Sequence, residues 1–166
     1  MLDFLRVKTV PTVSWSSPRP LNFFPALRTF VLLCIGLVLF GVGEALLINA
    51  GVGVSPWTVF SQGVANTSGL GIGMSTFFIG VGVLVLWIPL RQTPGLGTLL
   101  NIIIIAAVME LSLPYLPQMA GTVSGIIQTM LGVFIVGLGS GLYLVANLGP
   151  GPRDGVMTGL QRVTGL

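Results

Sequence analysis

Charged residues are scarce in this sequence of 166 residues, and histidine is missing altogether. Only 7% of the residues are Asp, Glu, Lys or Arg, whereas a soluble domain has roughly 25%. So few charges cannot cover a surface that faces water, and 53% hydrophobic residues with a mean hydropathy of +1.00 agree with this. The composition therefore predicts an integral membrane protein, with the lipid bilayer as its main partner.

The same scarcity excludes several kinds of chemistry. Without histidine there is no Ser-His-Asp or Cys-His catalysis and no His-ligated metal site, and the sequence has no G-x-x-x-x-G-K-[ST] motif for ATP. Cys34 is the single cysteine, so an internal disulfide is excluded, and its apolar surroundings indicate a core residue. The net charge of +3 is too small and too scattered for nucleic acid. We therefore expect no enzyme activity, no metal, no cofactor and no nucleic-acid partner.

Four apolar segments approach the ~20 residues that a spanning helix needs. They predict an all-α polytopic helical bundle with spans at about 27–49, 72–90, 96–116 and 123–146. The stretch between the first two spans is too polar to cross alone. Ser55 and Pro56 are nevertheless typical of a helix start, as N-cap and first helical residue, and Gly69 is typical of a helix end. The sequence thus predicts a short non-crossing helix at 56–69, and a similar one at 152–164.

Basic residues set the expected topology. Residues 1–25 contain three Lys or Arg and four prolines, which is typical of an irregular cytoplasmic tail. If 56–69 does not cross the membrane, Arg91, Arg153 and Arg162 fall on the same side as this tail, and the loops on the other side carry no charge. The excess of Lys and Arg on cytoplasmic segments therefore predicts a cytoplasmic N-terminus and four spans.

The end of the chain repeats an earlier stretch. Sliding the sequence by 96 positions places Gly149 on Gly53 and Pro152 on Pro56 without a gap, and glycines of the first span fall on glycines of the fourth. Three crossings separate the two copies, which predicts an inverted-topology repeat of the kind that secondary transporters use. Its units are 26–122 and 123–166. The second unit lacks two spans of the first, so the sequence predicts a truncated product of a six-span protein.

Both copies contain a Gly- and Pro-rich break before a short helix. Free N–H groups and the helix dipole at such a start favour an anion, and Arg153 can bind a carboxylate or phosphate with two hydrogen bonds. The alternative is an ordinary interfacial turn, in which Arg153 meets lipid phosphates and Asp154 caps the helix or pairs with Arg153. The candidate substrate-binding residues in the two breaks are Ser55, Pro56, Trp57, Asn147, Gly149, Gly151, Pro152, Arg153 and Asp154.

Glu44 is a further candidate, because it lies inside the first span. A carboxylate in the membrane is costly, and such residues usually face a cavity or a partner. The alternative is that Glu44 stays wet near the outer interface. Glu110, near the end of the third span, is a weaker candidate of the same kind. Either acid could carry a coupling proton, and the repeat places Ser140 rather than an acid opposite Glu44.

The motifs also carry a family resemblance. ANLGPGPRDGVMTGLQRVTG at 146–165, GVGVSPWTVFSQGVANTSGLGIG at 51–73 and the loop 94–98 are similar to YczE/YyaS/YitT-type bacterial integral membrane proteins. The resemblance implies a multi-span helical fold in the bacterial plasma membrane. Our leading hypothesis is a transporter-like protein that binds or moves a small, anionic solute. The alternative is an accessory or assembly protein without transport activity, working as a homo-oligomer or with a membrane partner.

Overall fold

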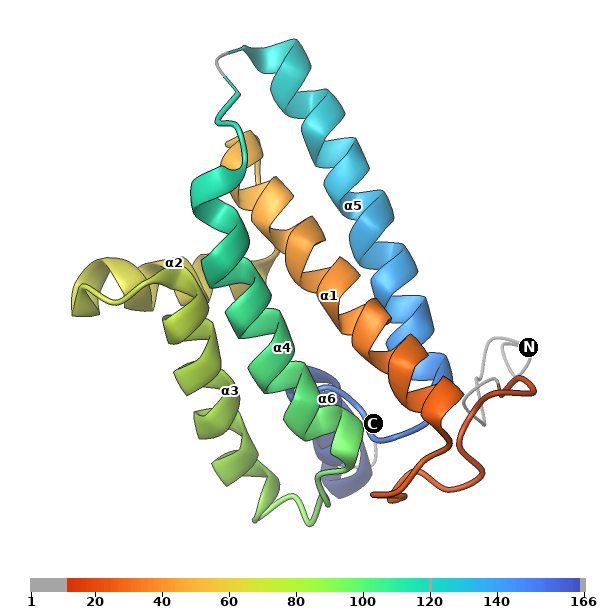
Figure 1. Cartoon of the computed structure of the whole chain (residues 1–166). Coiled ribbons are helices and arrows are strands. Elements are labelled where there is room, and N and C mark those ends of the chain that lie inside the picture. Colours follow the sequence, from red (N-terminus) through yellow and green to blue (C-terminus); the bar gives the residue numbers. More distant parts are fainter. Residues whose placement is uncertain (1–11, 120, 165–166) are drawn as a thin grey trace, which may run out of the picture.

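A computed structural model describes residues 12–119 and 121–164 and contains only helices and connecting segments over these ranges (Figure 1). The predicted cytoplasmic tail includes residues 1–11, with Arg6 and Lys8, which lie outside the described residues. The helices are α1 (Leu27–Ala50), α2 (Pro56–Ser68), α3 (Ile72–Trp87), α4 (Leu96–Ser112), the short 3-10 helix η2 (Leu113–Tyr115), α5 (Thr122–Val145) and α6 (Pro152–Thr164).

Three of these helical segments are long and apolar enough to cross a membrane: α1, α4 together with η2, and α5. The pair α2 and α3 adds a fourth span if its two helices count as one, although they are bent by 111° at their junction. The protein is therefore an all-α membrane protein with three to four candidate spans. The structure ends α3 at Trp87 rather than near residue 90, because a turn follows and Arg91 adopts a left-handed φ of 51°.

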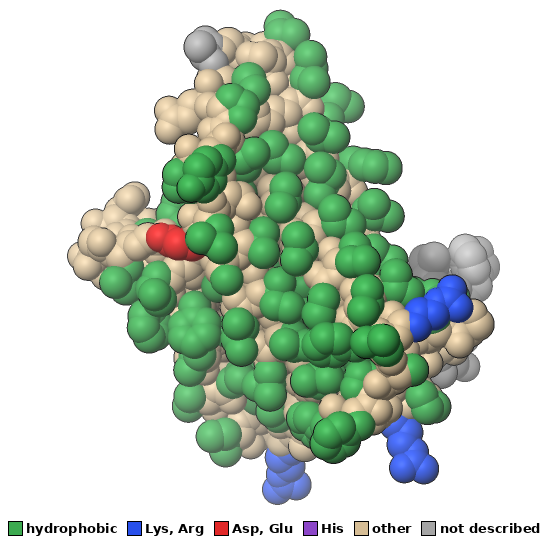
Figure 2. All heavy atoms as spheres, in the orientation of Figure 1, with side chains coloured by type: hydrophobic (Ala, Val, Ile, Leu, Met, Phe, Trp, Pro, Cys, Tyr) green, Lys and Arg blue, Asp and Glu red, His purple; other side chains and the backbone are tan. Residues whose placement is uncertain are grey.

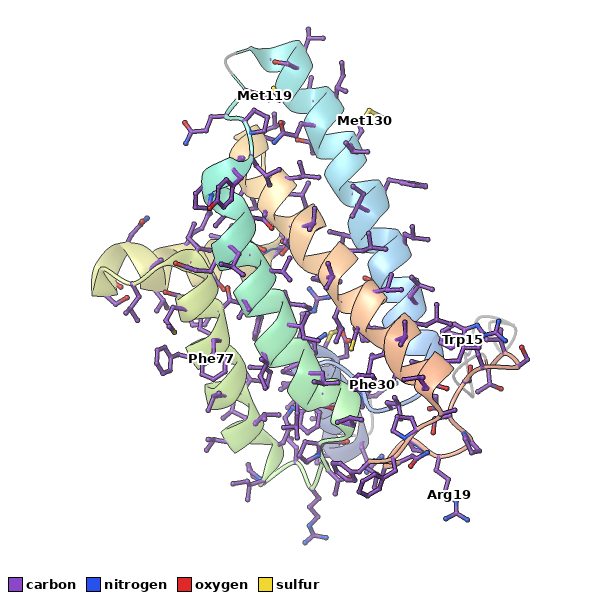
Figure 3. The ribbon with its side chains drawn as sticks, in the orientation of Figure 1. Trp15, Arg19, Phe30, Phe77, Met119 and Met130 are labelled. Atoms are coloured by element: carbon purple, nitrogen blue, oxygen red, sulfur yellow. The ribbon has the colours of Figure 1, made fainter. Side chains whose placement is uncertain are left out.

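Helix α1 lies in the middle of the bundle, packed between α5 on one side and α4 on the other (Figure 1). Helix α3 covers the far side of α4, α2 extends crosswise from its upper end, and α6 packs against α3 near its lower end. The basic side chains visible in Figure 2 lie toward this lower end, and hydrophobic side chains cover most of the same face. In Figure 3 Arg19 points away from the bundle there, whereas Met119 and Met130 lie toward the opposite end.

Glycines bring the backbones of α1 and α5 into contact. A Cβ atom added to Gly139 would lie 2.6 Å from the carbonyl oxygen of Gly36, and one added to Gly36 would lie 2.9 Å from that of Gly139. Gly43 and Gly132 make a second reciprocal contact one level higher, at 3.0 and 3.1 Å. Helices in lipid gain little from apolar burial and associate through such close packing. The two glycine pairs therefore fix the antiparallel pairing of α1 with α5.

Glu110 holds the junction between α2 and α3. Its Oε2 accepts hydrogen bonds from the backbone N–H groups of Gly73 at 2.8 Å and Met74 at 3.3 Å, in the first turn of α3. A carboxylate at this position satisfies free donors and complements the positive end of the helix dipole. A Cβ on Gly71 or Gly73 would collide with Glu110 or with the α4 backbone. The structure thus gives Glu110 a capping contact between α4 and α3.

The glycine contact predicts a position-specific loss of stability. Gly139→Ala pushes a methyl group against the α1 backbone and should lower the free energy of unfolding by about 1–3 kcal/mol, the usual cost of overpacking. Gly137→Ala is the matched control on the same helix, because a Cβ there meets nothing within 4 Å. Thermal unfolding of the purified protein in detergent should show a lower midpoint for Gly139→Ala only. Equal midpoints for both variants would remove the backbone contact as the cause.

Candidate functional site

A cavity of about 70 Å³ lies where α2 and α6 begin, inside the bundle. Residues from all six α-helices, and from the segment just before α6, line it. Apolar side chains such as Phe40, Ile105 and Met109 form part of the wall. The polar and charged residues that line the cavity are Glu44, Thr58, Ser61, Thr76, Asn101, Tyr143, Arg153 and Asp154.

On the α1 and α2 side, Glu44 is the central group, and only 6% of it is exposed. The hydroxyl of Thr58 donates a hydrogen bond of 2.7 Å to its Oε2. Ser55 is the N-cap of α2, as the sequence predicts, because its Oγ accepts the N–H of Thr58. Since Thr58 Oγ1 donates to Glu44, the 2.8 Å contact between the hydroxyls of Ser55 and Thr58 has Ser55 as donor. The first turn of α2 is thus joined to the acid.

On the α6 side, Arg153 and Asp154 occupy the first turn of the helix. Asp154 accepts a hydrogen bond at Oδ2 from the hydroxyl of the buried Tyr143, and its Oδ1 lies 3.7 Å from Nε of Arg153. The Arg153 side chain keeps 46% of its surface exposed. An acid in the first turn complements the helix dipole. Asp154 therefore ties α6 to α5 and leaves the outer part of the guanidinium free to contact a ligand.

The Gly- and Pro-rich break before α6 is held by the first turn of α4. Gly97 N–H donates to the carbonyl of Leu148 and the hydroxyl of Thr98 donates to that of Pro150, both at 2.7 Å. Gly149 packs against Thr98 at a φ of 109°, which favours glycine. These hydrogen bonds satisfy backbone N–H and C=O groups outside the helices, for which lipid offers no hydrogen-bonding partner. The break is therefore a rigid support for the cavity.

Two further contacts fix the ends of this support. The indole N–H of Trp87 donates to the carbonyl of Pro152 at 3.0 Å. The side chain of Asn147, at a left-handed φ of 53°, donates to the carbonyl of Ser17 at 2.8 Å, and the N–H of Ser17 donates to the carbonyl of Ala146. Residues near the start of the chain thereby pack onto the end of α5.

The structure brings most of the predicted candidates together. Ser55 and Pro56 begin α2, and Ser55 reaches the lining through Thr58. Asn147 and Gly149 support the break and are not part of the lining. Within residues 12–119 and 121–164, no group of three His, Cys, Asp or Glu side chains could hold a metal. The candidates that line the cavity are Glu44, Trp57, Gly151, Pro152, Arg153 and Asp154.

Sequence reasoning missed several residues of the site, among them Thr58, Thr98, Asn101 and Tyr143. The repeat offered a signal for Thr58, because the shift of 96 positions places it on Asp154. In both copies this residue bonds to the preceding long helix, to Glu44 or to Tyr143. Thr98, Asn101 and Tyr143 stand in or beside apolar runs and come near the cavity through tertiary packing.

Comparison with known proteins identifies the family. Residues 27–166 match a family described as a family of unknown function, DUF6198. The chain belongs to this family. An uncharacterized protein of Haemophilus influenzae is 37% identical over 155 residues, which cover 93% of this chain and 70% of that protein. The uncharacterized membrane protein YczE of Bacillus subtilis is 34% identical over 134 residues, 78% of this chain and 61% of that protein. No solved structure gives a significant match.

These comparisons confirm the predicted resemblance to YczE-type membrane proteins. They support the description of this protein as a membrane protein of the DUF6198 family. The matched part of this chain spans about two thirds of the length of each relative, 70% and 61%.

The support of the break predicts the effect of one hydroxyl group. Thr98→Val keeps the shape of the side chain but leaves the Pro150 carbonyl without its donor and the Gly95 N–H without its acceptor. We expect the free energy of unfolding to fall by about 1–3 kcal/mol, the cost of unsatisfied buried groups. Thr98→Ser, which keeps the hydroxyl, should retain most of the thermal stability in detergent. A Thr98→Ser variant as unstable as Thr98→Val would show that packing rather than hydrogen bonding matters.

Proposed function

We propose that this protein is a transporter-like membrane protein that binds a small solute in the cavity between α2 and α6 and moves it across the membrane. One observation carries the proposal. The starts of two short helices, 96 positions apart in sequence, meet at one cavity that also contains the buried acid Glu44 and the base Arg153. Broken helices that begin at a buried site are the usual substrate sites of secondary transporters. In this proposal the protein catalyses no reaction.

The α6 side of the cavity suits an anionic group of the solute. Helix N-termini carry free N–H groups and about half a positive charge. Pro152, the first residue of α6, has no N–H, so the donors nearest the cavity come from the residues around it. Arg153 adds a planar guanidinium that can hold a carboxylate or phosphate with two hydrogen bonds. A solute of this kind would replace water at the exposed part of Arg153.

Internal symmetry supports transport by alternating access. A shift of 96 positions places Gly36 on Gly132 and Gly43 on Gly139. The two close contacts, Gly36 with Gly139 and Gly43 with Gly132, are therefore exchanged by this shift. That exchange is the mark of a two-fold axis between two antiparallel copies. Helices α2 and α6 also begin 96 positions apart and have 13 residues each. We infer that the repeat is an inverted-topology repeat whose axis passes between α1 and α5.

The same arguments give the proposed location and orientation. The basic residues Arg19, Arg91 and Arg162 belong to the tail, the α3–α4 connection and α6, which lie toward one end of the bundle. The positive-inside rule favours that end on the cytoplasmic side. We propose a multi-pass protein of the bacterial plasma membrane with a cytoplasmic N-terminus.

A second candidate function rests on the open face of α5. Gly41 on α1 packs against Val108 of α4, whereas its counterpart in the repeat, Gly137, faces open space, as does Gly141. Small residues four positions apart favour close approach of another helix in the membrane. An accessory role would use this face to bind another membrane protein or a second copy, and would tolerate changes in the cavity.

The proposed repeat predicts opposite exposure of equivalent positions. Ala26 and Thr122 are 96 positions apart, and both are exposed. In a Cys34→Ser background, a membrane-impermeant maleimide added to intact cells should label Thr122→Cys and not Ala26→Cys. Permeabilised cells provide the control, because both cysteines should then react. Labelling of both positions in intact cells would contradict the inverted topology.

The proposed site predicts stabilisation by a small anion. Acetate or inorganic phosphate should raise the thermal unfolding midpoint of the purified protein, since a ligand that binds only the folded state stabilises it. Arg153→Gln should abolish the shift. Arg162→Gln, which changes an exposed arginine of the same helix, is the matched control and should keep it. An accessory protein would instead show no ligand shift and would lose a partner when Gly137 is changed to Ile.

A further inference from the structure

The two sides of the cavity carry opposite charges that do not pair with each other. Among the described residues the one ion pair within 4.0 Å is that of Arg153 with Asp154, so Glu44 has no basic partner at that distance. Glu44 is only 6% exposed and accepts one side-chain hydrogen bond, from Thr58. A buried carboxylate is stable only when it is paired, hydrogen-bonded or protonated. Glu44 thus forms no close ion pair of its own, although Arg153 across the cavity is near enough to attract it, and an ammonium group of a ligand would find an acceptor there.

The opposite side lacks an anion. Arg153 has five N–H donors, and its contact with Asp154 involves Nε alone at 3.7 Å. Asp154 already accepts a hydrogen bond from Tyr143 at its other oxygen. Most of the guanidinium is therefore free to bind a carboxylate, beside the first turn of α6. Asn101, which also lines the cavity, adds an amide that can donate or accept a hydrogen bond.

We infer that the solute is a small zwitterion, with its ammonium group at Glu44 and its carboxylate at Arg153. This inference rests on the proposed binding function and adds the chemical class of the solute. The two charged groups of the zwitterion would each pair with one half-site, Glu44 on one side of the cavity and Arg153 on the other. The net charge inside the membrane would not change. A simple anion would approach the unpaired charge of Glu44, and a simple cation would leave Arg153 without a new partner.

The size of the cavity limits the solute. One water needs roughly 10–15 Å³ of such volume, so a cavity of about 70 Å³ has room for only a few groups of that size. Glycine, with one ammonium and one carboxylate joined by a single carbon, matches this size. The apolar wall of Ile102, Ile105 and Met109 tolerates the aliphatic carbon between the charged groups.

Three probes separate the two half-sites without any mutation. Glycine carries both charges, acetate lacks the ammonium group, and methylammonium lacks the carboxylate. Titration of the purified full chain at constant ionic strength, with thermal unfolding or tryptophan fluorescence as readout, should give the tightest binding for glycine. Trp57 lines the cavity and can report on occupancy. Acetate and methylammonium should bind at least about tenfold more weakly, the loss of one charged hydrogen bond.

Variants then assign each half-site. Glu44→Gln should weaken glycine at least about tenfold and should leave acetate as tight or tighter, because the repelling charge is gone, whereas Arg153→Gln should weaken both. Glu110→Gln is the matched control, because this carboxylate caps α3 and is not part of the lining. Acetate binding as tight as glycine binding, with glycine unaffected by Glu44→Gln, would overturn the zwitterion while leaving a solute site in place. If glycine, acetate, phosphate and methylammonium all fail to bind, both the inference and the proposed function fail.

Discussion

The contact on which the bundle depends is the approach of the α1 and α5 backbones at two glycine pairs. Any side chain at Gly36 or Gly139 would force the helices apart, because the opposing atoms are backbone atoms and the Cβ of Leu142, none of which can turn away like the end of a flexible side chain. Helix α1 lies in the middle, α4 packs on the side of α1 away from α5, and α3 packs against α4. Helices in lipid gain little hydrophobic free energy when they associate, so close van der Waals packing determines which helices pair. The position of the cavity follows from these contacts.

The cavity exists because two helices start inside the protein. Lipid cannot satisfy the broken backbone, so α4 supplies partners through Gly97 and Thr98, and α3 supplies Trp87. On the other side the hydroxyls of Ser55 and Thr58 link the start of α2 to Glu44. These bonds leave the charged groups of the site held in place but incompletely paired. A ligand with groups of opposite charge can pair with these preorganised side chains.

The membrane class, the helical segments and part of the cavity lining could be predicted from sequence, since they depend on local signals. Apolar length marks the spans, Ser55 and Pro56 mark a helix start, and a lone acid such as Glu44 marks a site within an apolar run. The angle of 111° between α2 and α3 could not be predicted, because contacts from another helix, such as that of Glu110 with the first turn of α3, help to hold it. Tyr143 and Asn101 gave no signal for the same reason: their role depends on which helices pack together.

The contact of the tail with the end of α5 has a consequence for biogenesis. Ser17 leaves the ribosome early, but its hydrogen-bonding partners Ala146 and Asn147 are separated from it by about 130 residues. The tail can therefore dock only after α5 has been synthesised and inserted. Closing so long a loop is slow compared with local helix formation. Docking of the tail thus follows the insertion of α5, and it adds hydrogen bonds to the support of the cavity.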